Sequence, residues 1–244
     1  PALMSRFQVF AFDFPGHGLS DRTNRGYRVT DYTAHMATLL SLPPFSTQHN
    51  WVIYGHSLGS MVAGALASQF SQKVHGVILE DPPFHTMGDR LTTTPLQSYF
   101  EGASQFAGSN APLSETVRNL AEIRMTNPAS GEATRLGDVR DEPSLRFAAK
   151  CLSQLDPRVY EPIVTGKWLE DFDWESDFAG INSPVLLLQA DPEAGGMLID
   201  ADANRLADLI PDLTRVRCDG VGHLIHCQQA ETLLRHLQNF LDTL

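Results

Sequence analysis

A serine, a histidine and several carboxylates occur in this chain in patterns that suit nucleophilic catalysis. Ser57 is the centre of Gly-His-Ser-Leu-Gly at 55–59, between an apolar run at 51–54 and a small-residue run at 60–70. A strand, a Gly-x-Ser-x-Gly turn and a helix together make a nucleophile elbow, which exposes the serine hydroxyl on a strained turn. We expect Gly55 and Gly59 to leave room where strand and helix meet. The helix N-terminus would point N–H groups at a developing oxyanion.

A serine hydroxyl needs a base to remove its proton, and the base needs an anionic partner. Among nine histidines we choose His223, because it follows a strand pattern and two nearby glycines free its loop to present the ring. We expect His56 to point away from the site and His17 to serve its own loop. His226 should lie in the first turn of the next helix.

The acid has more than one candidate. Asp81 follows an apolar run at 74–80, and Asp191 and Glu193 follow another at 184–190. Either strand end could place a carboxylate beside His223 at the carboxyl edge of a parallel sheet. We favour Asp81 and keep Asp191 and Glu193 open. Glu80 precedes Asp81 in the strand and should therefore point the opposite way.

Hydrophobic periodicity supplies the elements that would position these residues. Strands are predicted at 7–12, 51–54, 74–80, 184–190 and 214–218. Helices are predicted from Thr30 or Asp31 to Pro43, and at 60–70, 96–106, 113–125, 143–155, 201–210 and 228–241. The alternation predicts an α/β fold with a doubly wound, mostly parallel sheet. Residues 1–83 and 184–244 would form its core, and 84–183 a helical insertion.

The amino-acid composition argues against several classes of partner and site. The 244 residues are 42% hydrophobic and carry a net charge of −11 without a Lys/Arg cluster, which argues against nucleic acid and anionic membranes as partners. Three cysteines, Cys151, Cys218 and Cys227, lack metal-ligand spacing and indicate reduced thiols of a cytoplasmic protein. No apolar run approaches the roughly 20 residues of a membrane span. We expect a small-molecule substrate, no cofactor, no metal, and a monomer or homodimer.

Taken together, the motifs resemble the α/β-hydrolase superfamily over nearly the whole chain. The resemblance rests on Asp-Phe-Pro-Gly-His-Gly-Leu-Ser at 13–20, the pentapeptide at 55–59, and the segments 79–82, 184–189 and 220–223. It implies that Ser57 is the nucleophile and His223 the base, and that the Leu58 N–H donates to the oxyanion. It also implies that 84–183 caps the active site, as in capped esterases, lactonases and carbon–carbon hydrolases.

The chain departs from this superfamily in two places. Members usually carry Gly-x-x-Asp after the strand that ends here at Ala190, whereas this chain has glycine where that acid would stand. Haloalkane dehalogenases and a zearalenone lactonase instead place the acid after the earlier strand, and Asp81 matches that position. Members also begin with two or three further strands and a His-Gly loop. We therefore expect that the N-terminal strands are missing, through about 40–50 absent residues or a true truncation.

The leading hypothesis is a serine hydrolase that cleaves a carboxylic ester or lactone through an acyl-enzyme. Haloalkane dehalogenases and epoxide hydrolases need an aspartate at the elbow, so Ser57 disfavours both activities. A carbon–carbon bond hydrolase with the same triad is an alternative. A non-catalytic small-molecule binding protein and an inactive fragment are the others.

Overall fold

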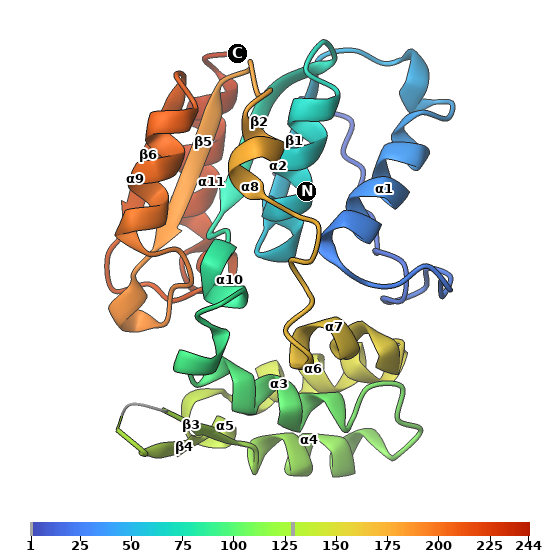
Figure 1. Ribbon diagram of the computed structural model, residues 1–244, viewed down its shortest axis with the longest axis vertical. Helices are drawn as coiled ribbons and strands as arrows, with labels where there is room; N and C mark the ends of the chain where they lie inside the picture. The colour runs from blue at the N-terminus through green and yellow to red at the C-terminus, as the bar shows by residue number, and fades with distance from the viewer. Residues whose placement is uncertain (1, 128–129) are drawn as a thin grey trace. The chain divides into compact units, whose positions relative to one another are not determined.

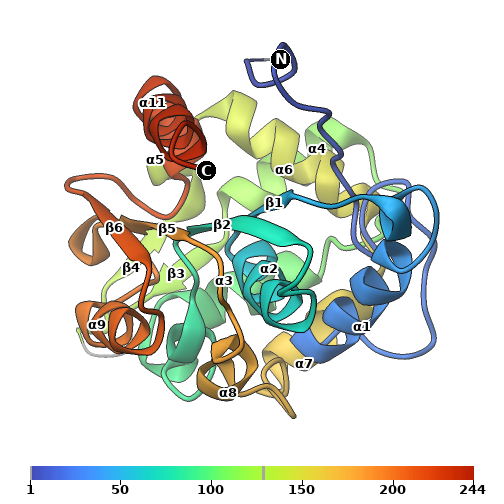
Figure 2. The ribbon, with the colours of Figure 1, turned by 90° about the horizontal axis from the view of Figure 1, so that it is seen from above.

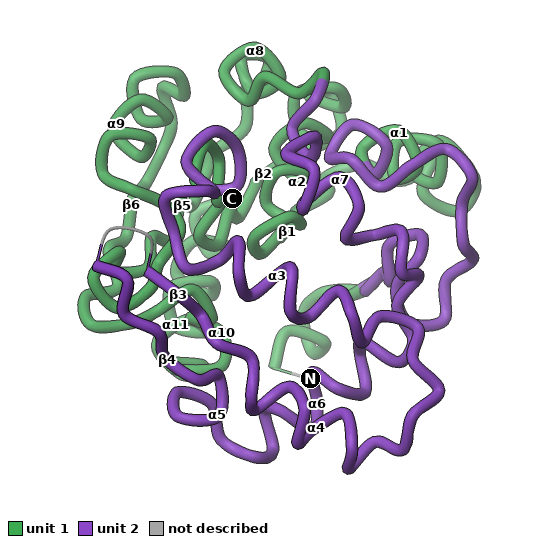
Figure 3. Tube along the Cα trace, turned by 60° about the horizontal axis from the view of Figure 1, so that its bottom comes forward, with its two compact units in different colours: residues 1–9, 33–86, 171–244 green, residues 10–32, 87–170 purple. Residues whose placement is uncertain are grey.

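The computed structural model describes residues 2–127 and 130–244. These residues form two compact units, shown in different colours in Figure 3. Unit 1 comprises 1–9, 33–86 and 171–244, and unit 2 comprises 10–32 and 87–170. The residues singled out above as nucleophile, base and acid all belong to unit 1.

Unit 1 is built on a four-stranded parallel sheet with the strand order β1-β2-β5-β6. Its strands are β1 (Trp51–His56), β2 (Val74–Glu80), β5 (Val185–Ala190) and β6 (Leu213–Cys218). All six residues of β5 are buried, as expected for a central strand covered on both faces. The predicted strands at 51–54, 74–80, 184–190 and 214–218 are thereby confirmed.

Helices cover both faces of this sheet (Figures 1 and 2). The helices of unit 1 are α2 (Leu58–Gln69), α8 (Trp174–Phe178), α9 (Asp200–Leu209), α10 (Ile225–Gln228) and α11 (Ala230–Leu241). In Figure 2, α11 lies on one side of the sheet and α2, α8 and α9 lie on the other. Leu233 and Leu237 of α11 pack into the same buried cluster as Ile78, Leu186 and Leu188 of the strands. The α1 helix (Val29–Leu40) begins in unit 2 and ends in unit 1.

Unit 2 is mainly helical. It contains α3 (Leu96–Ser104), α4 (Leu113–Ala121), α5 (Leu136–Val139), α6 (Glu142–Gln154) and α7 (Glu161–Val164). The predicted helices at 96–106, 113–125 and 143–155 correspond to α3, α4 and α6. An antiparallel hairpin of β3 (Arg124–Thr126) and β4 (Ala133–Arg135) was not predicted. Its strands have three residues each and are mostly exposed, so they leave no apolar alternation to recognise.

Short 3₁₀ turns complete the described chain. They are η1 (Phe45–Thr47), η2 (Phe84–Met87), η3 (Leu91–Thr93), η4 (Pro157–Tyr160) and η5 (Pro192–Ala194). Among the described helices, none combines the length and the apolar character that crossing a bilayer requires. Cys151, Cys218 and Cys227 are free thiols. That a helical segment caps the active site stays a prediction.

The predicted strand at 7–12 is wrong. Residues 8–14 have no regular secondary structure, and Val9, Phe10 and Phe12 are 52%, 46% and 41% exposed. A strand forms only where its backbone N–H and C=O groups find a ladder partner. The four-stranded sheet ends at β1 without pairing to this segment. Alternating apolar residues are therefore not sufficient here.

Candidate active site

Ser57 occupies the turn between β1 and α2, as the elbow motif predicts. Its backbone angles, φ 54° and ψ −120°, lie in a region that non-glycine residues rarely adopt. A Cβ atom at Gly55 would lie 2.0 Å from the carbonyl oxygen of Gly59, so only glycine fits there. A Cβ at Gly59 would meet no described atom within 4 Å. The expectation that Gly59 is also required for space is wrong.

Leu58 is the first residue of α2, so its backbone N–H has no acceptor within the helix. It is therefore available to a negatively charged oxygen near Ser57, and the helix dipole adds to that attraction. The turn itself is fixed by the Ser57 N–H, which donates to the Glu80 carbonyl at 3.0 Å. This bond joins the elbow to the end of β2.

Asp81 lies directly after β2 and is fully buried. Its carboxylate accepts backbone N–H groups from Ala190 at 3.2 Å, Met197 at 2.8 Å and Leu198 at 3.2 Å. The fourth partner is His223, whose Nδ1 lies 2.7 Å from Asp81 Oδ2. A carboxylate only accepts, so Nδ1 carries the proton and Nε2 is left as the basic nitrogen when the ring is neutral. The structure thus brings together the predicted base and the favoured acid.

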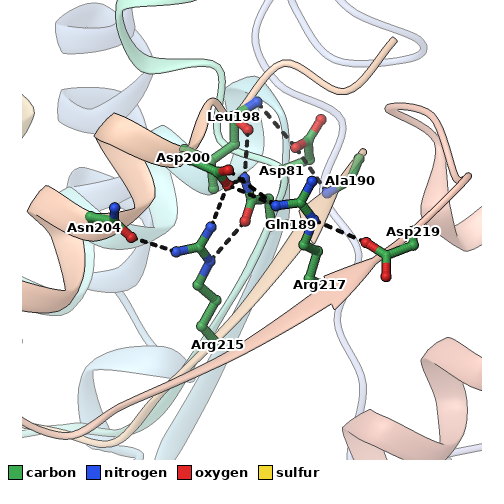
Figure 4. Close-up of polar contacts among 9 residues, drawn as sticks. All are labelled: Asp81, Gln189, Ala190, Leu198, Asp200, Asn204, Arg215, Arg217 and Asp219. Carbon is green, nitrogen blue, oxygen red and sulfur yellow. Dashed lines mark hydrogen bonds and ion pairs between the residues drawn. The ribbon is translucent and has the colours of Figure 1, made fainter. Parts of the chain in front are cut away.

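A polar network stabilises the segment that holds Asp81 (Figure 4). Gln189, fully buried in β5, donates to the Leu198 carbonyl at 2.9 Å and to Asp200 at 3.0 Å. Arg215 donates to Gln189 at 2.7 Å and to Asp200 at 2.6 Å. Sequence reasoning missed this support. The only signal was one glutamine in an otherwise apolar strand.

The alternative acids have other partners. Asp191 accepts N–H groups from Glu193 at 3.0 Å and Gly220 at 2.9 Å. These backbone bonds hold the pKa of Asp191 below its ordinary value and tie the loop before His223 to the end of β5. The Glu193 side chain is exposed. Asp191 therefore shapes the loop, while Asp81 contacts the ring of His223.

The expectation that His56 points away from the site is wrong. Its Nε2 lies 2.9 Å from the carbonyl oxygen of His223, and the two ring centroids are 4.4 Å apart. His226 lies in the first turn of α10, as predicted, and its Nδ1 is 2.9 Å from Glu80 Oε1. His17 bonds within its own loop, with Nδ1 3.2 Å from the Pro15 carbonyl.

The fold and the elbow together define the class. Residues 1–230 match the family model described as alpha/beta hydrolase fold, and the chain belongs to that family. The resemblance found in the motifs and the predicted fold class are confirmed.

Two relatives named for a hydrolytic activity align with most of this chain. It is 24% identical to 2-(acetamidomethylene)succinate hydrolase of Mesorhizobium japonicum, over 98% of this chain and 80% of that protein. It is also 24% identical to N-formylmaleamate deformylase of Pseudomonas putida, over 97% of this chain and 79% of that protein. The solved enol-lactonase of Burkholderia xenovorans superposes with a TM-score of 0.68 at 17% identity, covering 99% and 83% of the two chains. The fold and the names of the relatives support a hydrolase in general.

Proposed function

We propose that the protein is a serine hydrolase that cleaves a small carboxylic ester or lactone, with Ser57, His223 and Asp81 as its triad. The observation that carries the proposal is the 2.7 Å contact between His223 Nδ1 and the fully buried Asp81 carboxylate. The backbone carbonyl of His223 accepts a hydrogen bond from Nε2 of His56, the residue before Ser57. The nucleophile, the acid and the base therefore follow β1, β2 and β6 of one parallel sheet.

The chemistry follows from these positions. The Ser57 hydroxyl attacks the substrate carbonyl while its proton passes to His223 Nε2, and Asp81 stabilises the resulting imidazolium. The negative oxygen of the tetrahedral intermediate accepts the Leu58 N–H. Collapse breaks the ester bond, and the leaving alkoxide takes the proton from His223. Water then attacks the acyl-enzyme with the same base, releasing the acid and restoring Ser57.

The names of the relatives add other bond types to those that this protein could cleave. One relative that aligns with nearly all of this chain is named a deformylase, and the other a hydrolase of an acetamidomethylene compound. The same serine and histidine would serve an N-acyl or N-formyl substrate, because the acyl-enzyme forms in the same way and only the leaving group changes. We propose this as the second candidate, ahead of carbon–carbon cleavage.

The test is covalent trapping followed by turnover. A fluorophosphonate should label Ser57 in the wild-type protein, and mass spectrometry of the peptides should locate the adduct. The rates at which the protein hydrolyses nitrophenyl esters, lactones and N-formyl amides would then be compared. Ser57→Ala should reduce turnover of any substrate by roughly 10⁴-fold or more.

The matched pair Asp81→Asn and Asp191→Asn tests the acid. Asp81→Asn should lower kcat about 10⁴-fold, because an amide facing Nδ1 favours the wrong tautomer. Asp191→Asn keeps an oxygen for the Gly220 N–H and should change kcat only a few-fold. The opposite ranking would move the acid to the strand end at Asp191. A folded wild-type protein that is neither labelled nor active would favour the non-catalytic binding protein.

A further inference from the structure

A second cluster of chemically active side chains lies beside the proposed triad. Tyr54 and His56 are two residues apart on β1, and Glu80 is the last residue of β2. The register pairs His56 with Glu80 and Tyr54 with Ile78. Ile78 packs into the core cluster that α11 closes, so these side chains share that face of the sheet. Helix α10 adds His226 to the same place, through its contact with Glu80.

Glu80 is a fully buried carboxylate held in a fixed orientation. Tyr54 donates its hydroxyl to Oε2. The backbone N–H and the ring Nδ1 of His226 both lie 2.9 Å from Oε1. All three donors face the carboxylate oxygens, so Glu80 acts as an acceptor toward each of them. A buried, oriented carboxylate beside imidazole nitrogens is the kind of donor that divalent cations bind.

One ring nitrogen of His56 has no hydrogen-bond partner among the described residues. Its Nε2 faces the carbonyl oxygen of His223, which only accepts, so the proton must sit on Nε2. With the proton on Nε2, the neutral ring carries a lone pair on Nδ1. Within residues 2–127 and 130–244, Nδ1 makes no hydrogen bond. A histidine that ligates a metal commonly donates its other nitrogen to a carbonyl in this way.

One ligand atom from each of His56, Glu80 and His226 lies within 4.8 Å of the other two. We propose that these three residues form a binding site for a divalent transition-metal ion of the Zn²⁺ type. Two imidazoles and a carboxylate suit Zn²⁺, with water as the fourth ligand. The His226 side chain is 38% exposed, so the ion has a path from solvent and the ring has room to move. Binding would displace a proton from the contact between His226 and Glu80.

This site is separate from the triad, although it adjoins it. None of its three ligands is a residue assigned to the proposed serine chemistry, and metal binding can be measured whether or not the protein is a hydrolase. The bond from His56 Nε2 to the His223 carbonyl is compatible with a metal on the other ring nitrogen. A bound ion would therefore restrain the loop that carries His223. Sequence spacing could not reveal the site, because its ligands come from three separate segments.

The test uses Co²⁺ as a spectroscopic probe and equilibrium dialysis with Zn²⁺ on the purified chain. Wild-type protein should bind one ion per chain, show the visible bands of tetrahedral Co²⁺, and unfold at a higher Tm with Zn²⁺. His226→Gln removes a ring that is partly exposed and should weaken binding at least tenfold without unfolding the protein. His49→Gln, a substitution at an exposed histidine outside the cluster, is the matched control and should bind like the wild type.

Two further variants make the outcome decisive. Glu80→Gln should also weaken Zn²⁺ binding at least tenfold, with circular dichroism confirming that the variant is folded. His223→Ala should retain binding, because the variant keeps the backbone carbonyl that faces His56 Nε2 and loses only the ring packed on His56. No stoichiometric binding by the wild-type chain would overturn the proposal. So would full binding by His226→Gln, or loss of binding in His223→Ala alone, which would move the ion to the triad.

Discussion

Two residues of the proposed triad adopt backbone angles that side chains rarely tolerate. Ser57 has φ 54° and Asp81 has φ 46°. Each such conformation costs about 1–3 kcal/mol and persists only where neighbouring structure enforces it. The Gly-x-Ser-x-Gly motif predicts the strain at Ser57. At Asp81 the sequence shows only an aspartate before Pro82, which usually indicates an extended residue.

The strain at Ser57 predicts an unequal effect of two small substitutions. Ser57→Gly should be more stable than Ser57→Ala by about 1 kcal/mol, because glycine adopts φ 54° without a Cβ penalty. Both variants should be equally inactive. Urea unfolding monitored by circular dichroism measures the difference. Equal midpoints would show that the turn stores no such strain.

At the scale of elements, the junction of β1 and α2 depends on a single close approach. Gly55→Ala would place a methyl group 2.0 Å from the Gly59 carbonyl oxygen, which belongs to backbone and cannot swing aside. We expect a loss of about 3 kcal/mol in unfolding free energy, at the upper end for overpacking. Thermal and urea unfolding would measure it.

Gly59→Ala is the matched control for that substitution. Its new methyl group would meet no described atom within 4 Å, and alanine is the better helix former. Its stability should equal or exceed that of the wild type. A large loss in Gly59→Ala, or none in Gly55→Ala, would contradict this account of the elbow.

The elements predicted correctly are those whose own residues carry the signal. Continuous apolar runs gave β2 and β5, and the strand-turn-helix pattern gave β1 and α2. The segment 7–12 has the same local pattern but does not belong to the four-stranded sheet, and pairing is a property of the sheet rather than of the segment. Amphipathic spacing located α4 and α6, whereas the short β3–β4 hairpin had no pattern to find.

The residues of the proposed site also differ in whether the sequence alone reveals them. Ser57 and His223 are recognisable because motifs surround them, and Asp81 because it follows a strand. The donors that orient Asp81 are main-chain groups of Met197 and Leu198, which leave no signature in residue types. The position of His56 depends on a contact with His223, 167 residues away.

At the scale of the whole molecule, contacts distant in sequence determine the two compact units. Unit 2 joins residues 10–32 to 87–170. The Tyr27 hydroxyl donates to Asp156 at 2.7 Å, across 129 residues, and the Asp156 N–H donates to the Gly16 carbonyl at 2.8 Å. Asp156 is buried and also pairs with Arg158 at 2.7 Å. One carboxylate thus holds together two distant segments.

This carboxylate predicts a pH-dependent stability. Hydrogen bonds from Arg158 and Tyr27 hold the pKa of Asp156 well below its ordinary value. A lowered folded-state pKa stabilises the protein above the unfolded-state pKa of about 4, and this contribution is lost as the pH falls further. Asp156→Asn should therefore cost about 2 kcal/mol at pH 7 and less below pH 4. Urea unfolding from pH 7 to pH 3 measures both values.

Asp138→Asn is the control for Asp156. The Asp138 side chain is 59% exposed and its nearest cationic partner, Arg135, is 3.9 Å away. Its substitution should change stability by less than about 0.5 kcal/mol at any pH. A cost for Asp156→Asn that stays constant down to pH 3 would show that packing, not charge, is the source.

The backbone donors around Asp81 affect which substitutions the protein can tolerate. Its three N–H donors belong to the backbone of Ala190, Met197 and Leu198, so replacing those side chains leaves the donors in place. Only proline removes such a donor. Substitutions other than proline at these three positions therefore leave the Asp81 carboxylate with its backbone donors. Descendants could therefore change these side chains without losing the contacts that orient the proposed acid.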